Sequence, residues 1–145
     1  MKGMVNIMKL SFTKMHGCGN DYVYINGEEY NITNKKDLAI RLSDRHFGIG
    51  GDGIIFINPS TRADFEMEMY NADGSRAEMC GNGVRVFARF LTEKGLVDLP
   101  EGQVLHIGTR AGVRDIQKNK AGFAVDMGRW KPDAQEVLVS ARGID

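Results

Sequence analysis

Residues 79–95 read MCGNGVRVFARFLTEKG, and this stretch decides the fold that the sequence predicts. Apolar side chains recur here at the i, i+3, i+4, i+7 spacing of a helix, at Val84, Phe87, Ala88 and Leu91. More apolar surface lies on another side of the helix, at Val86 and Phe90. Only a narrow stripe is strongly polar, formed by Arg85, Arg89 and Glu93. Because a helix apolar around most of its circumference is usually buried on most sides, we expect a central helix, ended by Gly95 and surrounded by strands.

Cys80 comes immediately before this helix. The first turn of a helix leaves backbone N–H groups unpaired and carries roughly half a positive charge, which favours a thiolate over a thiol. Gly81, Asn82 and Gly83 follow and offer bare N–H groups suited to an anion such as a carboxylate. Cys80 is therefore a candidate base or nucleophile. Two alternatives stay open, since free cysteines are commonly buried and inert and the glycines could serve only a tight turn.

The stretch Cys18-Gly19-Asn20 echoes Cys80-Gly81-Asn82. A strand-like segment, not a helix, follows Cys18, so we expect this cysteine to be a loop residue packed against the core. Asn20 and Asn71 lie in two other glycine-containing loops. Their amides could hydrogen-bond a zwitterionic ligand, or they could serve only as turn residues.

Elsewhere the chain predicts short strands. Alternating or β-branched runs, bounded by turn residues, place them at 9–14, 22–25, 54–57, 65–70, 103–107, 112–117 and 122–127. A helix capped by Thr33 or Asn34 is expected to run toward Phe47, and a last strand candidate covers 137–139. Strands around one central helix indicate an α+β fold. We expect a disordered extension over 1–8, one domain over 9–128, and over 129–145 the start of a connection to a second domain.

Composition narrows the classes of ligand and compartment. The chain has 145 residues, and its 19 basic side chains balance 19 acidic ones, so no net field recruits nucleic acid or an anionic membrane. A small molecule is the expected partner. Two cysteines are too few for a disulfide framework, and neither lies in a closely spaced Cys/His cluster that would predict a metal site. The cytoplasm is the expected location.

Three other groups of residues give weaker indications of chemistry. The glycine-dense run at 48–53 matches neither a phosphate loop nor a dinucleotide fingerprint. A histidine could pair with Cys80 as in cysteine hydrolases, and the candidates are His16, His46 and His106. Arg85 and Arg89 could bind a distal carboxylate, although a buried ion pair with Glu93 or another acid explains them more simply.

At these residues the chain resembles a known family. Residues 15–22, 44–53, 70–90 and 125–128 are similar, in order, to motifs of the N-terminal half of diaminopimelate epimerases, and the resemblance covers about 9–128. It implies two similar halves, each a strand-rich barrel around a central helix, with the substrate between them. It also implies inversion of one stereocentre of diaminopimelate without pyridoxal phosphate, metal or any other cofactor.

The resemblance further implies roles for residues of this chain. Cys80 matches the first of two cysteines that face the substrate's α-carbon, Asn20 and Asn71 match substrate contacts, and Gly81 with Asn82 match the loop that holds the α-carboxylate. In the family the second cysteine lies in the C-terminal half, beyond these 145 residues, so we expect the chain alone not to epimerise efficiently. Cys18 stands where the family commonly has leucine. Other readings stay open: a related isomerase of the same fold, a cysteine hydrolase, a non-catalytic binding domain, and association into a homodimer.

Overall fold

The computed structural model describes residues 7–129 and contains a seven-stranded sheet and two helices. In chain order the elements are β1 (Thr13–Gly17), β2 (Asn20–Asn26), α1 (Lys35–Ser43), β3 (Gly53–Asn58), β4 (Phe65–Asn71), α2 (Gly81–Glu93), β5 (Val104–Thr109), β6 (Gly112–Asn119) and β7 (Gly122–Val125). The α+β expectation is confirmed. The strand expected at 137–139 lies outside the described residues.

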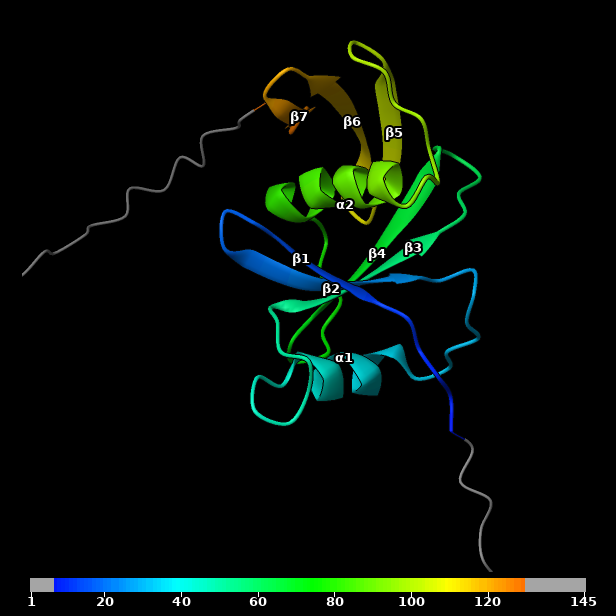
Figure 1. Ribbon diagram of the computed structural model, residues 1–145, viewed down its shortest axis with the longest axis vertical. Helices are drawn as coiled ribbons and strands as arrows, with labels where there is room; N and C mark the ends of the chain where they lie inside the picture. The colour runs from blue at the N-terminus through cyan, green and yellow to red at the C-terminus, as the bar shows by residue number, and fades with distance from the viewer. Residues whose placement is uncertain (1–6, 130–145) are drawn as a thin grey trace, which may run out of the picture.

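The strands follow one another across the sheet in chain order, and the sheet curls around α2 (Figure 1). Neighbouring strands are antiparallel except for β2 with β3 and β4 with β5, which are parallel. A parallel pair needs a long crossover, and each crossover here contains a helix. The first, α1, covers the outer face of the sheet, whereas the second, α2, lies inside its curve.

The two faces of the sheet carry two separate hydrophobic cores. Along β2 the side chains of Tyr22 and Tyr24 point toward α2, whereas Val23 and Ile25 join the cluster around α1. β3 is divided in the same way, which explains why its sequence GIIFIN is continuously apolar instead of alternating. Both faces of the middle strands are therefore buried.

The central helix agrees closely with its prediction. Seven of its residues are buried, and Phe87 and Leu91 are completely enclosed. Gly95 has φ +68° and its N–H donates to the Thr92 carbonyl, so it ends the helix as expected. The expected burial of an Arg89–Glu93 ion pair is wrong, however. These side chains do pair at 2.7 Å, but they are 59% and 51% exposed, on the one stripe of α2 that faces solvent.

The largest differences from the expected element boundaries are at the first strand and the first helix. The first strand runs over 13–17 and not 9–14, because the hairpin register pairs Thr13 with Tyr24 while the Ser11 N–H donates to the Tyr30 hydroxyl outside the ladder. The helix α1 begins after its predicted cap, Asn34, but ends at Ser43. The chain turns there because the Asp44 carboxylate accepts hydrogen bonds from the backbone N–H groups of His46 and Phe47 in the following loop.

The burial of α2 predicts that alanine substitutions at two phenylalanines differ greatly in their effect on the free energy of unfolding. Replacing the fully buried Phe87 by alanine should lower the free energy of unfolding by about 3–5 kcal/mol, since the cavity would lie in the middle of the inner core. Phe47 is 96% exposed, so Phe47→Ala should change it by less than about 0.5 kcal/mol. Urea denaturation followed by circular dichroism measures both, and equal effects would contradict this description of the core.

Candidate active site

Cys80 is the N-cap residue of α2. Its backbone is extended, with φ −133°, and its Sγ accepts the Gly83 N–H at 3.5 Å. The thiol is half-buried. Gly81 and Asn82 stand in the first turn, where backbone N–H groups have no acceptor within the helix. Gly83 packs so closely on the sheet that an added Cβ would lie 3.3 Å from Ile55 Cδ1. The helix start is thus held firmly against β3, with free donors beside a thiol.

Two buried tyrosines of β2 lie under this helix start. The Tyr24 hydroxyl donates to the Gly83 carbonyl at 3.1 Å. Burial, followed by the proximity of Cys80, raises the pKa of Tyr22 far above its usual value near 10. Burial also raises the pKa of Tyr24, with a smaller contribution from Cys80. Both hydroxyls therefore stay neutral at physiological pH, so the wall behind Cys80 is uncharged.

Asn20 and Asn82 meet although they are 62 positions apart in the sequence. The Asn82 Nδ2 donates to Asn20 Oδ1 at 2.7 Å, and Asn20 Nδ2 donates to Asp52 Oδ2 at 3.3 Å. The Arg85 guanidinium, one turn along α2, donates to Asn82 Oδ1. The structure thus brings together Cys80, its neighbours in the first turn, and the expected amide from the start of β2.

The strand register explains this meeting. β2 begins at Asn20, the parallel strand β3 begins just after Asp52, and the antiparallel strand β4 ends at Asn71. All three loops therefore lie at the same end of the sheet, with Gly53 paired to Asn71. The Asn71 side chain is used differently from that of Asn20, because its Nδ2 donates to Ser75 Oγ at 3.0 Å within its own loop.

A cluster of charged side chains lies beside Asn20, and no pattern in the sequence predicts it. Arg45 donates through both terminal nitrogens to Asp21, at 2.8 and 3.0 Å, and also reaches Asp52 at 3.2 Å. Hydrogen bonding to Arg45, opposed by partial burial, holds the pKa of Asp21 well below its usual range. Lys14 adds to this effect at 3.4 Å. The cluster ties the loop after α1 to the start of β2, and only the register brings these residues together.

Cys18 does not pack against the core, so that expectation is wrong. It is exposed in the two-residue turn between β1 and β2, with φ +52°, followed by Gly19 at φ +87°. Positive φ at both positions is the hairpin geometry that matches strand twist, and here it leaves the thiol outside the core. Arg85 contacts Cys18 Sγ at 3.6 Å as well as Asn82. Arg85 therefore does not form the expected ion pair with Glu93 or another acid of the described residues.

The histidines give the hydrolase hypothesis no support. His16 and His46 are exposed, on β1 and in the loop after α1, and His106 Nδ1 lies 2.6 Å from Asp115 on neighbouring strands. Within residues 7–129 no hydrogen bond joins a histidine to Cys80. In the same range no three His, Cys, Asp or Glu side chains gather in a way that could hold a metal ion. Neither helix of the described part has the length and apolarity to cross a membrane.

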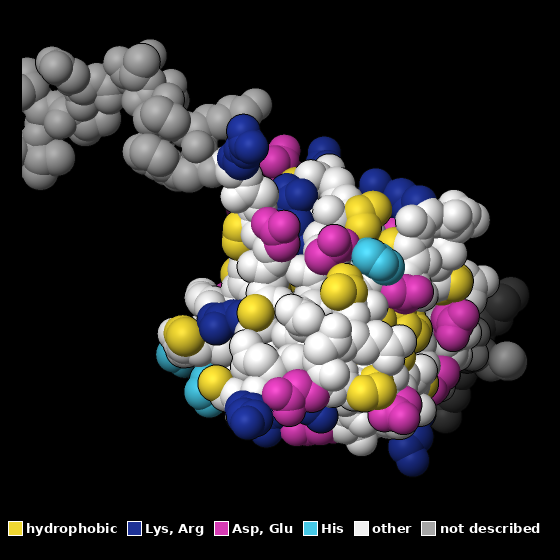
Figure 2. Space-filling view, turned by 90° about the horizontal axis from the view of Figure 1, so that it is seen from above, with side chains coloured by type: hydrophobic (Ala, Val, Ile, Leu, Met, Phe, Trp, Pro, Cys, Tyr) yellow, Lys and Arg dark blue, Asp and Glu magenta, His cyan; other side chains and the backbone are white. Residues whose placement is uncertain are grey.

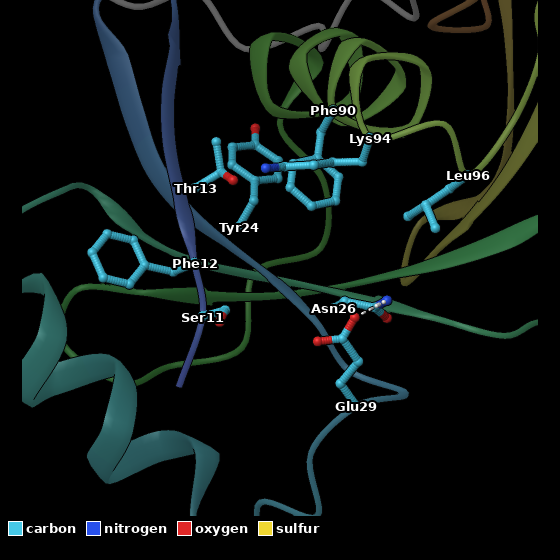
Figure 3. A pocket seen from close by; sticks show the side chains of 9 residues that line it. All are labelled: Ser11, Phe12, Thr13, Tyr24, Asn26, Glu29, Phe90, Lys94 and Leu96. Atoms are coloured by element: carbon cyan, nitrogen blue, oxygen red, sulfur yellow. Dashed lines mark hydrogen bonds between the residues drawn. The ribbon is translucent and has the colours of Figure 1, made fainter. Parts of the chain in front are cut away.

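A pocket also lies away from Cys80, at the other end of α2. Acidic and basic side chains are interspersed on the face seen in Figure 2, without a large patch of one sign. A pocket of about 230 Å³ lies between β1, β2 and the far end of α2, where Phe90 and Lys94 line it (Figure 3). Its carboxylate, Glu29, already accepts from Asn26. None of the expected site residues lines this pocket, so the candidate site remains the loop end of the sheet at Cys80.

Solved structures with this arrangement define the fold. The Bacillus anthracis phenazine biosynthesis protein of the PhzF family is 22% identical, with a TM-score of 0.59, over 81% of this chain and 40% of that one. A methylitaconate-delta-isomerase is 18% identical, with a TM-score of 0.60, over 88% and 67%. The curled sheet around a buried helix therefore places the chain in the fold class of PhzF-like proteins.

Sequence comparison identifies the family within that class. The family model "Diaminopimelate epimerase" matches residues 12–131. The diaminopimelate epimerase of Leptospira biflexa is 55% identical over 127 residues, which are 83% of this chain and 44% of that protein. The diaminopimelate epimerase of Agathobacter rectalis is 49% identical over 124 residues, which are 82% of this chain and 42% of that protein. The chain belongs to the diaminopimelate epimerase family, and it spans less than half the length of these relatives.

The Asp21–Arg45 pair predicts a pH-dependent term in stability. A depressed carboxyl pKa in the folded state contributes stability that is present above the usual value near 3.8 and is lost as the pH falls below it. Asp21→Asn should therefore be less stable than the parent at pH 7, and the difference should shrink as the pH is lowered from 5 to 3. Urea midpoints measure it, with Asp98→Asn, an exposed site, as control. A difference independent of pH would refute this role for the pair.

Proposed function

We propose that these residues form one half of the active site of an epimerase, which interconverts LL- and meso-diaminopimelate by proton transfer without pyridoxal phosphate or metal. Cys80 exchanges the proton of the α-carbon. The first-turn N–H groups of Gly81 and Asn82 bind the α-carboxylate, and Asn20 and Asn71 also contact the substrate. One observation carries the proposal: a half-buried thiol caps α2 next to free N–H donors and the Asn20–Asn82 pair.

The reaction has a clear electronic requirement. The α-hydrogen of an amino acid is weakly acidic, and the charge left by its removal spreads into the carboxylate. A thiolate at Cys80 would take the proton, so that the C–H bond breaks, an S–H bond forms and the electron pair moves toward the carboxylate oxygens. Fixed N–H donors stabilise that charge as it develops, and removal of one such donor typically costs about 100-fold to 1,000-fold in rate. The neutral tyrosine wall adds no competing charge at the thiol.

Inversion also needs an acid on the opposite face of the α-carbon. We assign that role to a second cysteine outside these 145 residues, in the C-terminal half that the longer relatives have. Its thiol would deliver a proton to the face opposite Cys80. Both sulfurs must stay reduced for this cycle, which fits a cytoplasmic enzyme. The substrate is bound between the two halves, and the described half contributes one thiol and part of the carboxylate site.

Proton exchange in deuterated water tests this function. LL-diaminopimelate is incubated with the 145-residue chain, and with any longer product of the same gene, and NMR follows both deuterium at the α-carbon and the meso product. The longer form should catalyse both, and the chain alone should not invert efficiently. Cys80→Ala should lower the rate of the longer form by about 100-fold to 10,000-fold, the range typical of a positioned acid–base group.

Cys18→Ser is the matched control, since it removes the other thiol of the described chain but keeps an acceptor for Arg85, and it should leave the rate within about twofold, as for a side chain outside the chemistry. Inversion that survives without Cys80 would disprove the assignment. Hydrolysis of an ester or amide that depends on Cys80 would instead identify a hydrolase, and inversion of proline-like substrates alone would identify a related isomerase. Biological activity retained in Cys80→Ala would indicate a binding domain.

A further inference from the structure

Four side chains form a continuous hydrogen-bonded series beside Cys80, which we call the amide relay: Arg85, Asn82, Asn20 and Asp52. Arg85 donates to Asn82 Oδ1, Asn82 Nδ2 donates to Asn20 Oδ1, and Asn20 Nδ2 donates to Asp52 Oδ2. The series crosses from the first turns of α2 to the start of β2 and then to the start of β3. Its members come from α2, from the first residue of β2 and from the loop just before β3, and the sheet register brings the last two together.

The two ends of the amide relay determine its direction. A guanidinium can only donate hydrogen bonds and an ionised carboxylate can only accept them, whereas an amide does both and can rotate to exchange its oxygen and nitrogen. With Arg85 at one end and Asp52 at the other, one orientation of the two amides satisfies every bond. Reversing either amide would place two donors or two acceptors face to face. The relay therefore determines which neighbour faces the amide oxygen, and which faces the amide nitrogen, of each asparagine.

This orientation leaves defined groups for a ligand. Each side-chain NH₂ has two hydrogens, and the relay uses one from Asn82 and one from Asn20. One N–H on each asparagine donates to no other group of the described residues, and Asn82 itself stands in the first turn of α2, where backbone N–H groups have no acceptor within the helix. All of these are donors, which suits a carboxylate. If the Asn82 amide were reversed, its oxygen would take the place of this N–H donor and would repel the anion.

The position of Arg85 is itself held by the fold. The same guanidinium contacts Cys18 Sγ at 3.6 Å, so it bridges the β1–β2 turn and the helix start. The backbone around it is closely packed, because a Cβ added at Gly17 would lie 2.9 Å from Val86 and 3.2 Å from the Asn82 carbonyl oxygen. At the other end, Asp52 is fixed by Arg45 and by the Asp21 N–H. Both ends of the relay are therefore anchored independently.

We propose that Arg85 and Asp52 are positioning residues, which orient the amides of Asn82 and Asn20 so that both present N–H donors to a carboxylate at Cys80. Neither residue acts on the substrate directly. The proposal rests on the proposed function for the identity of the ligand, but the orientation of the amides is a property of the free protein and can be measured without any ligand.

NMR of the ¹⁵N-labelled chain tests the relay. The side-chain NH₂ signals of Asn20 and Asn82 are assigned by Asn20→Asp and Asn82→Asp. Arg85→Met, which keeps an unbranched chain but removes the donors, should shift the Asn20 side-chain signals, although Arg85 does not bond to Asn20. Arg85→Lys, which keeps a donor, should restore them. Arg89→Met, four residues further along α2 and paired only with Glu93, is the matched control and should leave them unchanged.

Binding gives the second readout. Titration with LL-diaminopimelate, followed by the same signals, should show affinity about tenfold weaker for Arg85→Met, consistent with the loss of one charge-assisted hydrogen bond, and affinity near the parent value for Arg85→Lys and Arg89→Met. Unchanged Asn20 signals in Arg85→Met would overturn the relay. A parent chain and a longer form that neither bind nor convert the amino acid would overturn the proposed function instead. If Arg85→Met does not fold, Asp52→Asn tests the relay from its other end, with Asn82 as the reporter.

Discussion

The burial of α2 is the constraint on which the rest of the structure depends. Because this helix is apolar on all sides except one stripe, it is stable only where a surface surrounds it, and a sheet that curls around it supplies that surface. The inner positions of the sheet then have to meet the helix closely, as Ile55 meets Gly83. This contact fixes the height of the helix start over the sheet. The position of Cys80 is thus a consequence of core packing and not of the loop that precedes it.

The two parallel strand pairs bring the residues of the candidate site to one end of the sheet. Their crossovers place α1 on the outer face and α2 on the inner face, so the inner and outer cores stabilise the same middle strands from both sides. The loops at 20, 52 and 71 consequently gather at one end of a rigid sheet. These positions are therefore well placed, since Asn20 and Asn71 are the end residues of β2 and β4 and Asp52 immediately precedes β3.

The sequence predicted what is local and missed what depends on register. The periodicity of α2, its end at Gly95 and the capping of α1 by Asn34 involve neighbours within a few positions, and all three are confirmed. The Asn20–Asn82 bond and the Arg45 cluster join residues from separate elements, so no spacing in the sequence reveals them. The expected burial of Cys18 is wrong for a different reason. A Cys-Gly pair is not a usual signal for a turn with positive φ at both positions, and residue type alone favours burial of a cysteine.

Among the described residues, both arginines near Cys80 donate their hydrogen bonds to other side chains of the protein. Arg45 is neutralised by Asp21 and Asp52, and Arg85 donates its charge-assisted bonds to Asn82 and Cys18. A cation at the site would already attract the carboxylate of the bound amino acid strongly, and that part of the attraction strengthens binding without accelerating proton transfer. Oriented neutral donors interact more strongly as negative charge grows on the carboxylate oxygens. Placing the arginine one hydrogen bond away, behind Asn82, strengthens such a donor while keeping the full charge at a distance from the reacting atoms.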